Sequence, residues 1–387
     1  MKPSRPNVLV AASVASMLDL FNRENFRLLQ DMGCQVEAAA NFRFGNITSP
    51  KRVAQFRREL AERGIRVHDI PIPRRITDVR NIVRSYQVLK KLCAHNDYRL
   101  IHTQSPIGGA VIRLAARRSR KKGTKVIYTA HGFHFYQGAP LYRWMLFYPA
   151  EKWLSYYTDT LITINAEDYR RARRFHAGRL VRLPGIGICL EDFCPDAEKR
   201  KKLRRTFGFP EQDFVVLSVG QLSRRKNQEV MIRAMAMLKD RNVRYVIAGI
   251  GEQEPKYRAL IQKLGLEATV FLAGYRDDIP DLLRMADCFV FPSRQEGLPV
   301  SLMEAMAAGV PVVCSRIRGN CDLVRDGIEG RVVRANDAAG FAAAVRQIME
   351  QPKRAESYQK HARERVRGFS KQRVNAGMER IYRQSLL

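Results

Sequence analysis

Short apolar runs alternate with stretches of helical periodicity along the whole chain. The runs predicted to be strands in the first half are NVLVAAS (7–13), QVEAAA (35–40), LIHTQ (100–104), KVIYTAHG (125–132), TLITIN (160–165) and LVRLPGI (180–186). In the second half they are FVVLSVG (214–220), RYVIAGIG (244–251), VFLAG (270–274), CFVFPS (288–293), VPVVCS (310–315) and GRVV (330–333). Apolar strands between amphipathic helices are typical of parallel sheets that are buried on both faces and joined by right-handed crossovers.

The strand pattern restarts after a charged segment that contains proline, CPDAEKRKKLRRTFGFPEQDF (194–214). We interpret it as a linker followed by the first helix of a second domain, and 387 residues is a length expected of two domains. The sequence therefore predicts an α/β protein with two doubly wound, Rossmann-like domains, residues 1–190 and 191–369, facing each other across a cleft. Residues 370–387 have helical periodicity after a serine cap and are expected to pack back on the N-terminal domain as a last helix.

The N-terminus has two interpretations. Lys2 and Arg5 precede a short apolar stretch with small residues, which is the pattern of a signal peptide. The same stretch, residues 7–13, is followed at once by an amphipathic helix and a second strand, as at the start of an α/β domain. We favour the strand. No apolar run approaches the roughly 20 residues needed to cross a bilayer.

The chain is strongly basic, with 68 Lys and Arg against 38 Asp and Glu, and residues 1–190 hold 33 of the former and 13 of the latter. This excess favours a polyanionic partner: nucleic acid, an anionic membrane surface or a phosphorylated ligand. Charge alone does not choose among them. The seven cysteines form no CxxC pair, which indicates a reducing compartment and argues against a zinc site.

Loops after two strands of the second half carry candidate phosphate-binding residues. Gly220 ends a strand, Arg225 and Lys226 follow in the loop, and Asn227 opens an amphipathic helix. A cation beside a helix N-terminus suits a phosphate, although an ordinary basic turn has the same sequence. After the next strand, Gly249 and Gly251 allow a ligand to approach the backbone or form a tight turn, and the full GxGxxG pattern is absent.

The stretch FPSRQEGLPVSLMEAMAAGVPVV (291–313) places two glutamates around the start of an apolar helix. Pro299 is expected in the first turn, so the N–H groups of Gly297 and Leu298 would lie at the helix N-terminus. An ionised carboxylate accepts hydrogen bonds from vicinal hydroxyls, so Glu304 suits a ribose and Glu296 a transferred sugar. The alternative is that each is a solvated charge.

The spacing E-G-x-P-x-x-x-x-E resembles the signature of the retaining glycosyltransferases of family four, which have the GT-B fold. The resemblance covers nearly the whole chain and also includes VGQLSRRKN (219–227), FLAGYRDDIPDLLRMADCFVFPS (271–293) and DLVRDGIEGRVV (322–333), in the family's order. It implies a nucleotide-sugar donor, expected to be a UDP-sugar, and no metal or other cofactor. The implied donor-binding residues are Gly220, Gln221, Arg225, Lys226, Gly249, Gly251, Tyr275, Arg276, Glu296, Gly297, Leu298, Pro299 and Glu304, with Lys226 on the diphosphate, Glu304 on the ribose and Glu296 on the sugar.

Gln221 departs from the family pattern. The family usually has an arginine at this position as a second cation for the diphosphate, and Gln cannot neutralise charge. Arg224 or Arg225 is expected to substitute. Chains with Gln or Glu here resemble a subgroup that is associated with capsular and exopolysaccharide assembly.

In the first domain, the family has a histidine at the strand end that corresponds to His131, near the donor sugar. The resemblance assigns this role, and with it a catalytic contribution beside Lys226 and Glu296, to His131; His134 is a weaker candidate. Without the resemblance, a strand-end histidine is more often structural. Gly108 and Gly109 open a helix after another strand-end loop and are expected on the acceptor side.

Residues 133–157 hold 10 of the chain's 34 aromatic residues, with basic residues on either side. Two interpretations stay open. Because Trp and Tyr favour lipid–water boundaries, the stretch could lie on a membrane and accept a polyprenyl-diphosphate-linked sugar. It could also be a helix packed in the interdomain groove. Residues 16–30 are predicted to form a second apolar and basic helix that contributes to such a surface.

The sequence thus predicts a retaining, metal-independent hexosyl- or N-acetylhexosaminyltransferase. It would act in the cytoplasm, peripherally on the inner face of the cytoplasmic membrane, and transfer sugar from a UDP-sugar to a sugar or lipid-linked acceptor in cell-surface polysaccharide assembly. No nucleic acid is expected as a partner. The alternatives are a basic nucleic-acid-binding protein, or another GT-B enzyme such as a phosphorylase or a nucleotide-sugar epimerase.

Overall fold

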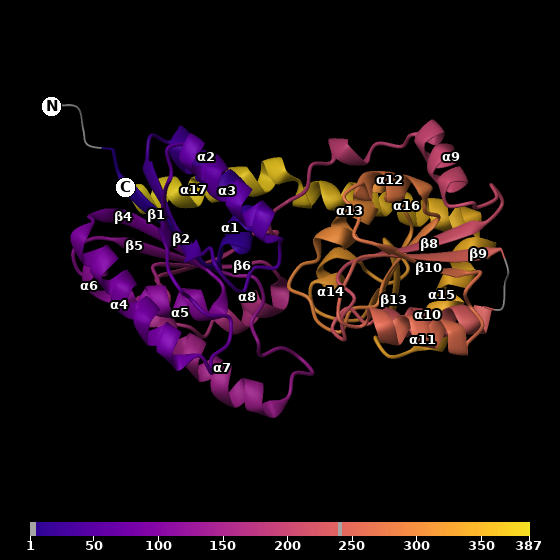
Figure 1. The fold of residues 1–387 in the computed structure, drawn as a ribbon, viewed down its shortest axis with the longest axis horizontal. Coiled ribbons are helices and arrows are strands. Elements are labelled where there is room, and N and C mark those ends of the chain that lie inside the picture. Colours follow the sequence, from indigo (N-terminus) through magenta and orange to yellow (C-terminus); the bar gives the residue numbers. More distant parts are fainter. Residues whose placement is uncertain (1–4, 239–241) are drawn as a thin grey trace. The chain divides into compact units, whose positions relative to one another are not determined.

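The computed structural model describes residues 5–238 and 242–387. The chain divides into two compact units, one made of residues 1–186 with 373–387 and the other of residues 187–372. Each unit is built on one parallel sheet with helices on both faces (Figure 1). Within the described part of the chain, no helix combines the length and the apolar character needed to cross a membrane.

The first unit has a seven-stranded sheet in the order β3-β2-β1-β4-β5-β6-β7. The strands are β1 (Asn7–Val14), β2 (Gln35–Asn41), β3 (Arg66–Asp69), β4 (Tyr98–Gln104), β5 (Lys125–Ala130), β6 (Thr160–Thr163) and β7 (Arg179–Arg182). The helices are α1 (Ala15–Phe21), α2 (Arg23–Asp31), α3 (Pro50–Glu62), α4 (Val79–His95), α5 (Pro106–Ala115), α6 (Arg117–Arg120), α7 (Leu141–Leu154), α8 (Ala166–Ala172) and α17 (Lys371–Leu386). The preferred interpretation of the N-terminal stretch is confirmed, because β1 is a buried central strand.

The second unit has a six-stranded sheet in the order β10-β9-β8-β11-β12-β13. The strands are β8 (Phe214–Val219), β9 (Val243–Ala248), β10 (Val270–Gly274), β11 (Cys288–Phe291), β12 (Val312–Ser315) and β13 (Gly330–Val333). The helices are α9 (Ala197–Thr206), α10 (Gln228–Leu238), α11 (Glu254–Lys263), α12 (Ile279–Met285), α13 (Val300–Ala308), α14 (Asn320–Leu323), α15 (Ala338–Glu350) and α16 (Pro352–Val366). All strands predicted for this half are present.

Two predictions for the first unit need correction. Strand β3 was not predicted, because its sequence, RVHD, is short and polar and lies at the edge of the sheet, where no residue is fully buried. The single helix expected over residues 16–30 is two helices that meet at Asn22. Phe26, Leu28 and Leu29 are buried, so much of the apolar surface of this segment covers the unit's own sheet.

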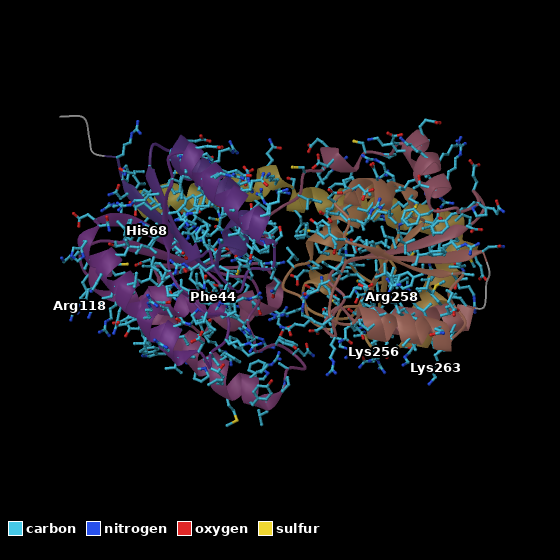
Figure 2. All side chains as sticks on the ribbon, in the orientation of Figure 1. Phe44, His68, Arg118, Lys256, Arg258 and Lys263 are labelled. Carbon is cyan, nitrogen blue, oxygen red and sulfur yellow. The ribbon has the colours of Figure 1, made fainter. Side chains whose placement is uncertain are left out.

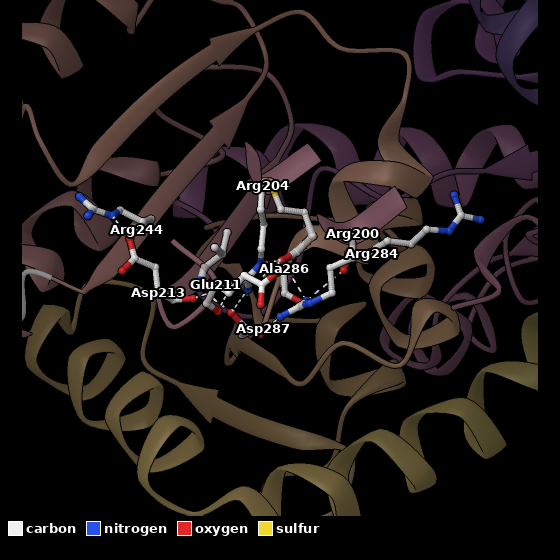
Figure 3. A network of polar contacts seen from close by, with 10 residues as sticks. Arg200, Arg204, Glu211, Asp213, Arg244, Arg284, Ala286 and Asp287 are labelled. Carbon is white, nitrogen blue, oxygen red and sulfur yellow. Dashed lines mark hydrogen bonds and ion pairs between the residues drawn. The ribbon is translucent and has the colours of Figure 1, made fainter. Parts of the chain in front are cut away.

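A polar network fixes the amino ends of the strands in the second unit (Figure 3). Asp287, directly before β11, accepts hydrogen bonds from the backbone N–H of Val215 (2.7 Å) and from Arg200 (2.6 Å), and it is paired with the buried Arg204. Arg204 also donates to the carbonyl oxygen of Asp213 at 2.8 Å. The network joins α9 to β8 and β11 and leaves the carboxyl ends of the strands to the loops.

Candidate functional site

The loops that follow β8 and β11 meet because these strands are parallel neighbours in the sheet. Asn227 holds the first loop in place. Its backbone is left-handed, with φ of 58°, and its side-chain amide donates to the carbonyl oxygens of Pro292 at 3.1 Å and Ala335 at 2.7 Å. The residue before it, Lys226, is therefore positioned by carbonyl groups at the ends of two other strands.

Lys226 and Arg225 both bind one carboxylate oxygen. The ammonium nitrogen of Lys226 lies 2.9 Å from Oε1 of Glu296, and Nη1 of Arg225 lies 2.6 Å from the same atom. Burial lowers the pKa of Lys226, and Glu296 opposes this decrease. Burial acts to raise the pKa of Glu296, but Lys226 and Arg225 outweigh it and hold the pKa below its usual value. The two short ion pairs favour the charged forms of Lys226 and Glu296.

An aromatic ring and a backbone hydrogen bond support this cluster. The Lys226 ammonium lies 4.6 Å from the centre of the Phe291 ring, at the end of β11. The N–H of Arg294 donates to the carbonyl oxygen of Arg225 at 2.8 Å, so the two loops are joined through their backbones. The ring contact adds a cation–π attraction for the ammonium.

Glu304 lies on α13, and its side chain is mostly buried. No hydrogen bond or ion pair joins this side chain to a residue that the structure describes. Burial raises its pKa to about 7. A mostly buried carboxylate without a partner is costly unless a ligand supplies donors. The assignment of Glu304 to ribose hydroxyls stays a prediction.

The start of α13 offers backbone donors. The helix begins at Val300, with Pro299 at the N-cap rather than inside the first turn as predicted. Within the described chain, no hydrogen bond occupies the N–H of Gly297 or Leu298. The carbonyl oxygen of Glu296 accepts from the buried Arg318 at 3.1 Å, which fixes the loop just before these donors.

Three predicted glycines are explained by backbone packing. A Cβ on Gly249 would lie 2.0 Å from the carbonyl oxygen of Gly220, and one on Gly251 would lie 2.3 Å from that of Leu222. The loops after β8 and β9 therefore run in contact, and only glycine fits. At Gly220, φ is 150° and a Cβ would lie 3.2 Å from Cε of Lys226.

The remaining predicted donor-binding residues of the second unit lie outside the cluster of Lys226, Arg225 and Glu296. Gln221 and Arg224 are exposed, and Arg224 has no side-chain partner among the described residues. Tyr275, in the loop after β10, is 75% exposed. Arg276 next to it is paired with Asp278, with Nε 2.7 Å from the carboxylate. Of the two arginines considered as substitutes at the Gln221 position, Arg225 is thus the one that lies in the cluster.

In the first unit, His131 directly follows β5. Its Nε2 is hydrogen-bonded to the side-chain oxygen of Gln104, whose amide in turn contacts Asn22. Burial lowers the pKa of His131 to about 4, so the imidazole is neutral at pH 7. With Nε2 donating to Gln104, Nδ1 is an acceptor.

The other predicted residues of the first unit make contacts within that unit. The N–H of Gly108 donates to Oγ of Ser13 at 3.1 Å, and a Cβ on Gly109 would lie 2.6 Å from the ring of Tyr128. The helix begins two residues before Gly108, at Pro106. His134 stacks on Phe147 of α7, with ring centres 4.7 Å apart.

Sequence reasoning did not find the roles of Asn227, Phe291 and Arg318. Asn227 lies in the stretch VGQLSRRKN, but its anchoring role depends on carbonyl groups that follow two other strands. A non-glycine residue with left-handed backbone has no reliable signal in a single sequence, although asparagine is one of the residues that tolerates it.

Two doubly wound units of this kind, with cations, free N–H donors and carboxylates at the carboxyl edge of the second sheet, constitute the GT-B architecture. Residues 199–365 match the family model described as glycosyl transferases group 1, and residues 21–185 match the glycosyl transferase 4-like domain. The chain belongs to this family, the family-four type of glycosyltransferase, and is a glycosyltransferase. The nucleic-acid-binding, phosphorylase and epimerase alternatives receive no support from these comparisons.

Individual relatives agree with the family. The chain is 38% identical over 380 residues, 97% of its own length and 96% of the relative's, to a Bacillus subtilis (strain 168) protein named as the glycosyltransferase EpsD. It is 29% identical, over 71% of each chain, to an Escherichia coli UDP-Gal:α-D-GlcNAc-diphosphoundecaprenol α-1,3-galactosyltransferase. The crystal structure of Anabaena HepE in complex with UDP has a TM-score of 0.78, with 18% identity over 98% of this chain and 100% of that one, which shows a shared fold.

Proposed function

We propose that the second unit binds a UDP-sugar and that the enzyme transfers the sugar, with retention of configuration, to an acceptor linked to a lipid diphosphate in cell-surface polysaccharide assembly. The observation that carries the donor part is the cluster in which Lys226 and Arg225 share one oxygen of Glu296. Support for the nucleotide and acceptor comes from the UDP and UDP-glucose complexes of HepE and from the named substrates of the Escherichia coli relative.

The cluster suggests how a diphosphate binds. Lys226 and Arg225 are held together by one carboxylate, and a diphosphate would offer them two negative charges instead. The free N–H groups of Gly297 and Leu298, at the positive end of α13, supply further donors. In this proposal Arg225 provides the second cation that Gln221 lacks.

When the diphosphate replaces the Glu296 carboxylate at the two cations, each glutamate can take its proposed role. Once the diphosphate holds the cations, Glu296 is released to accept hydrogen bonds from hydroxyls of the transferred sugar. Glu304, which has no partner among the described residues, accepts from the ribose hydroxyls. Both roles use an ionised carboxylate as acceptor.

In the transfer step, the bond between the anomeric carbon and the diphosphate oxygen breaks, and the acceptor hydroxyl oxygen forms a bond to the same carbon from the same face. The hydroxyl proton passes to the leaving diphosphate. Charge that develops on the diphosphate is stabilised by Lys226, Arg225 and the helix N-terminus, so we propose that no metal is needed. The neutral His131 in the first unit offers an uncharged acceptor at Nδ1 on the acceptor side.

We propose further that this enzyme works on the cytoplasmic face of a membrane. A lipid-diphosphate acceptor is confined to a bilayer, and nucleotide sugars are cytoplasmic metabolites. The +30 charge of the chain favours an anionic surface.

The proposal is tested with Lys226→Ala and Glu304→Ala, and with Arg224→Ala as the matched control from the same loop. Thermal shift with UDP-sugars measures donor binding, and release of UDP in the presence of lipid-linked acceptor measures transfer. We expect both site variants to fold, to lose the UDP-sugar shift and to lose transfer by about 10²–10³-fold, because a charge-stabilising donor is removed in one case and a ribose contact in the other. Near-normal transfer by both variants would refute the site.

A further inference from the structure

Helix α7 lies at the edge of the first unit (Figure 1), and one of its faces is exposed and apolar. The exposed positions follow the spacing i, i+1, i+4, i+5, i+8, i+9 and i+12, which is one side of a helix: Leu141, Tyr142, Met145, Leu146, Pro149, Ala150 and Trp153. Leu141 is 73% exposed and Met145 is 71% exposed. None of these seven residues is charged, on a chain with a net charge of +30.

The inner face of α7 is anchored to the unit. Glu151 is buried and paired with Arg113 at 2.8 Å, and it accepts a hydrogen bond from Tyr128 at 3.1 Å. Phe147 and Trp144 pack against the unit's aromatic core. The inner face is therefore aromatic around one buried ion pair, while the outer face is apolar, and an outer face of that kind is normally covered. A continuous exposed apolar face of this kind marks a binding surface.

A cavity of about 500 Å³ lies beside this helix and is lined by arginines. Its lining is Gln137, Trp144, Tyr148, Glu167, Arg170, Arg171 and Arg174. Arg171 pairs with Glu167 at 2.8 Å and lies 4.3 Å from the Trp144 ring centre. Arg170 and Arg174 are exposed, and neither side chain has a partner among the residues that the structure describes. Three arginines and one carboxylate leave two net positive charges.

Part of the cavity lining, Gln137 and Glu167, lies near the carboxyl ends of β5 and β6. Gln137 belongs to the loop after β5, the loop that begins with His131, and α8 follows β6. Both loops leave the carboxyl ends of neighbouring strands, where doubly wound sheets bind ligands. The adjoining sequence is basic as well: residues 98–150 contain nine Lys or Arg and no Asp or Glu.

We propose that this cavity binds the diphosphate of a polyprenyl-diphosphate lipid, while the exposed face of α7 enters the bilayer interface beside it. The two net positive charges match the two negative charges of a diphosphate diester. Tyr142 and Trp153, near the ends of the exposed face, are residue types enriched at lipid–water boundaries. The inference rests on the lipid-linked acceptor of the proposed function and assigns it a site.

The test is sedimentation of the full-length protein with three kinds of vesicle. These are phosphatidylcholine alone, phosphatidylcholine with undecaprenyl diphosphate, and phosphatidylcholine with phosphatidylglycerol at the same surface charge. We expect strongest binding to the undecaprenyl diphosphate vesicles. Arg170→Gln with Arg174→Gln should weaken that binding about 25-fold, since each arginine near an anionic surface contributes about fivefold, and should remove the preference over phosphatidylglycerol.

A matched control removes two arginines elsewhere in the same unit. Arg117 and Arg118 are exposed on α6, and Arg118 projects from the surface of this unit (Figure 2). Arg117→Gln with Arg118→Gln should keep the preference for undecaprenyl diphosphate. Met145→Ser with Leu146→Ser should weaken binding to every vesicle by at least about tenfold, because the apolar face no longer enters the interface. Unchanged melting temperatures show that these exposed substitutions leave the fold intact.

Several results would overturn the inference. Equal binding to diphosphate and phosphatidylglycerol vesicles would mean a general anionic surface. Equal losses in the Arg170/Arg174 variant and the Arg117/Arg118 variant would mean that the cavity does not bind the diphosphate. A dimer that Met145→Ser with Leu146→Ser converts to a monomer, without vesicle binding, would mean that α7 covers a second copy. None of these vesicle assays contains a nucleotide-sugar donor. If vesicle binding fails but the UDP-sugar thermal shift is retained, this inference is wrong while the proposed donor site stands.

Discussion

At the scale of single residues, the cluster of Glu296, Lys226 and Arg225 must rearrange when a diphosphate binds. Glu296 pairs with both cations in the free enzyme, with distances of 2.9 Å to Lys226 and 2.6 Å to Arg225. The same carboxylate repels an incoming diphosphate until the cations leave it. In the proposed function, Glu296 therefore opposes binding of the nucleotide and favours binding of the sugar.

Glu296→Gln should separate these two effects. We expect UDP to bind at least as tightly as to the wild type, because the competing charge is gone, while transfer falls about 10²-fold through loss of the charged sugar contact. Isothermal titration with UDP and a transfer assay measure the two quantities. Glu254→Gln, which removes a surface glutamate paired with Arg258, should change neither. If UDP binding weakens as much as transfer does, the proposed replacement of Glu296 by the diphosphate is contradicted.

Glu304 should make donor binding depend on pH. Burial raises its pKa to about 7, so the free enzyme holds about half a proton there at pH 7. Donor hydroxyls favour the ionised form, so binding of a UDP-sugar should release this proton, and affinity should decrease as pH falls below 7. Titrations in buffers of different ionisation enthalpy measure the release, which Glu304→Gln should abolish.

The same pKa shift has a consequence for stability. A carboxyl whose folded pKa lies above its unfolded value stabilises the fold only while it is protonated, so this contribution is lost as pH rises from about 4.5 to 7. Glu304→Gln should therefore raise the melting temperature of the free enzyme at pH 8 and change it little at pH 4.5. An equal effect at both pH values would contradict the burial of an ionisable Glu304.

At the scale of elements, Asn227 determines where the loop after β8 places Lys226. Asn227→Gly keeps the left-handed backbone but loses two hydrogen bonds to buried carbonyls, and we expect a loss of about 1–3 kcal/mol in unfolding free energy. Asn227→Ala adds backbone strain of about 1–2 kcal/mol. Denaturant unfolding and UDP titration measure both, and affinity should fall in each variant. Wild-type affinity in both variants would mean that Lys226 is held by other contacts.

The elements predicted well from the sequence are those whose own residues determine them. Buried strands such as β8 and β11 are continuous apolar runs, and the loops after them contain Lys226 and Glu296. Strand β3 was missed because an edge strand gains its stability from pairing with β2, which no local pattern records. The pairing of Arg225 with Glu296 joins residues 71 positions apart, so the sequence left Arg224 and Arg225 as alternatives.

At the scale of the whole molecule, both units use one device to fix the amino ends of their sheets. Asp159 precedes β6, accepts from the N–H of Val126 at 2.7 Å and binds Arg120 at 2.9 Å. Asp287 precedes β11 and bonds to the N–H of Val215 and to Arg200 and Arg204 in the same way. An aspartate before a strand thus ties a neighbouring strand and a helix together. The amino ends of both sheets are held by these contacts, while the candidate donor site lies in loops at the carboxyl end of the second sheet.

The last helix, α17, belongs to the core of the first unit although it follows the second unit in sequence. Ile381 and Tyr382 are buried among residues of β1 and β2, and the Tyr382 hydroxyl lies 2.7 Å from Nδ1 of His102.

Since each unit has its own sheet and core, we expect two unfolding transitions in calorimetry. Ile381→Ala should reduce the unfolding free energy of the first unit by about 2–5 kcal/mol and so lower the melting temperature of its transition. A UDP-sugar should raise only the transition of the second unit, by mass action. Ile348→Ala, in the core of the second unit, is the matched control and should lower the transition that responds to UDP. If each substitution shifts both transitions equally, the units unfold together and α17 stabilises the molecule as a whole.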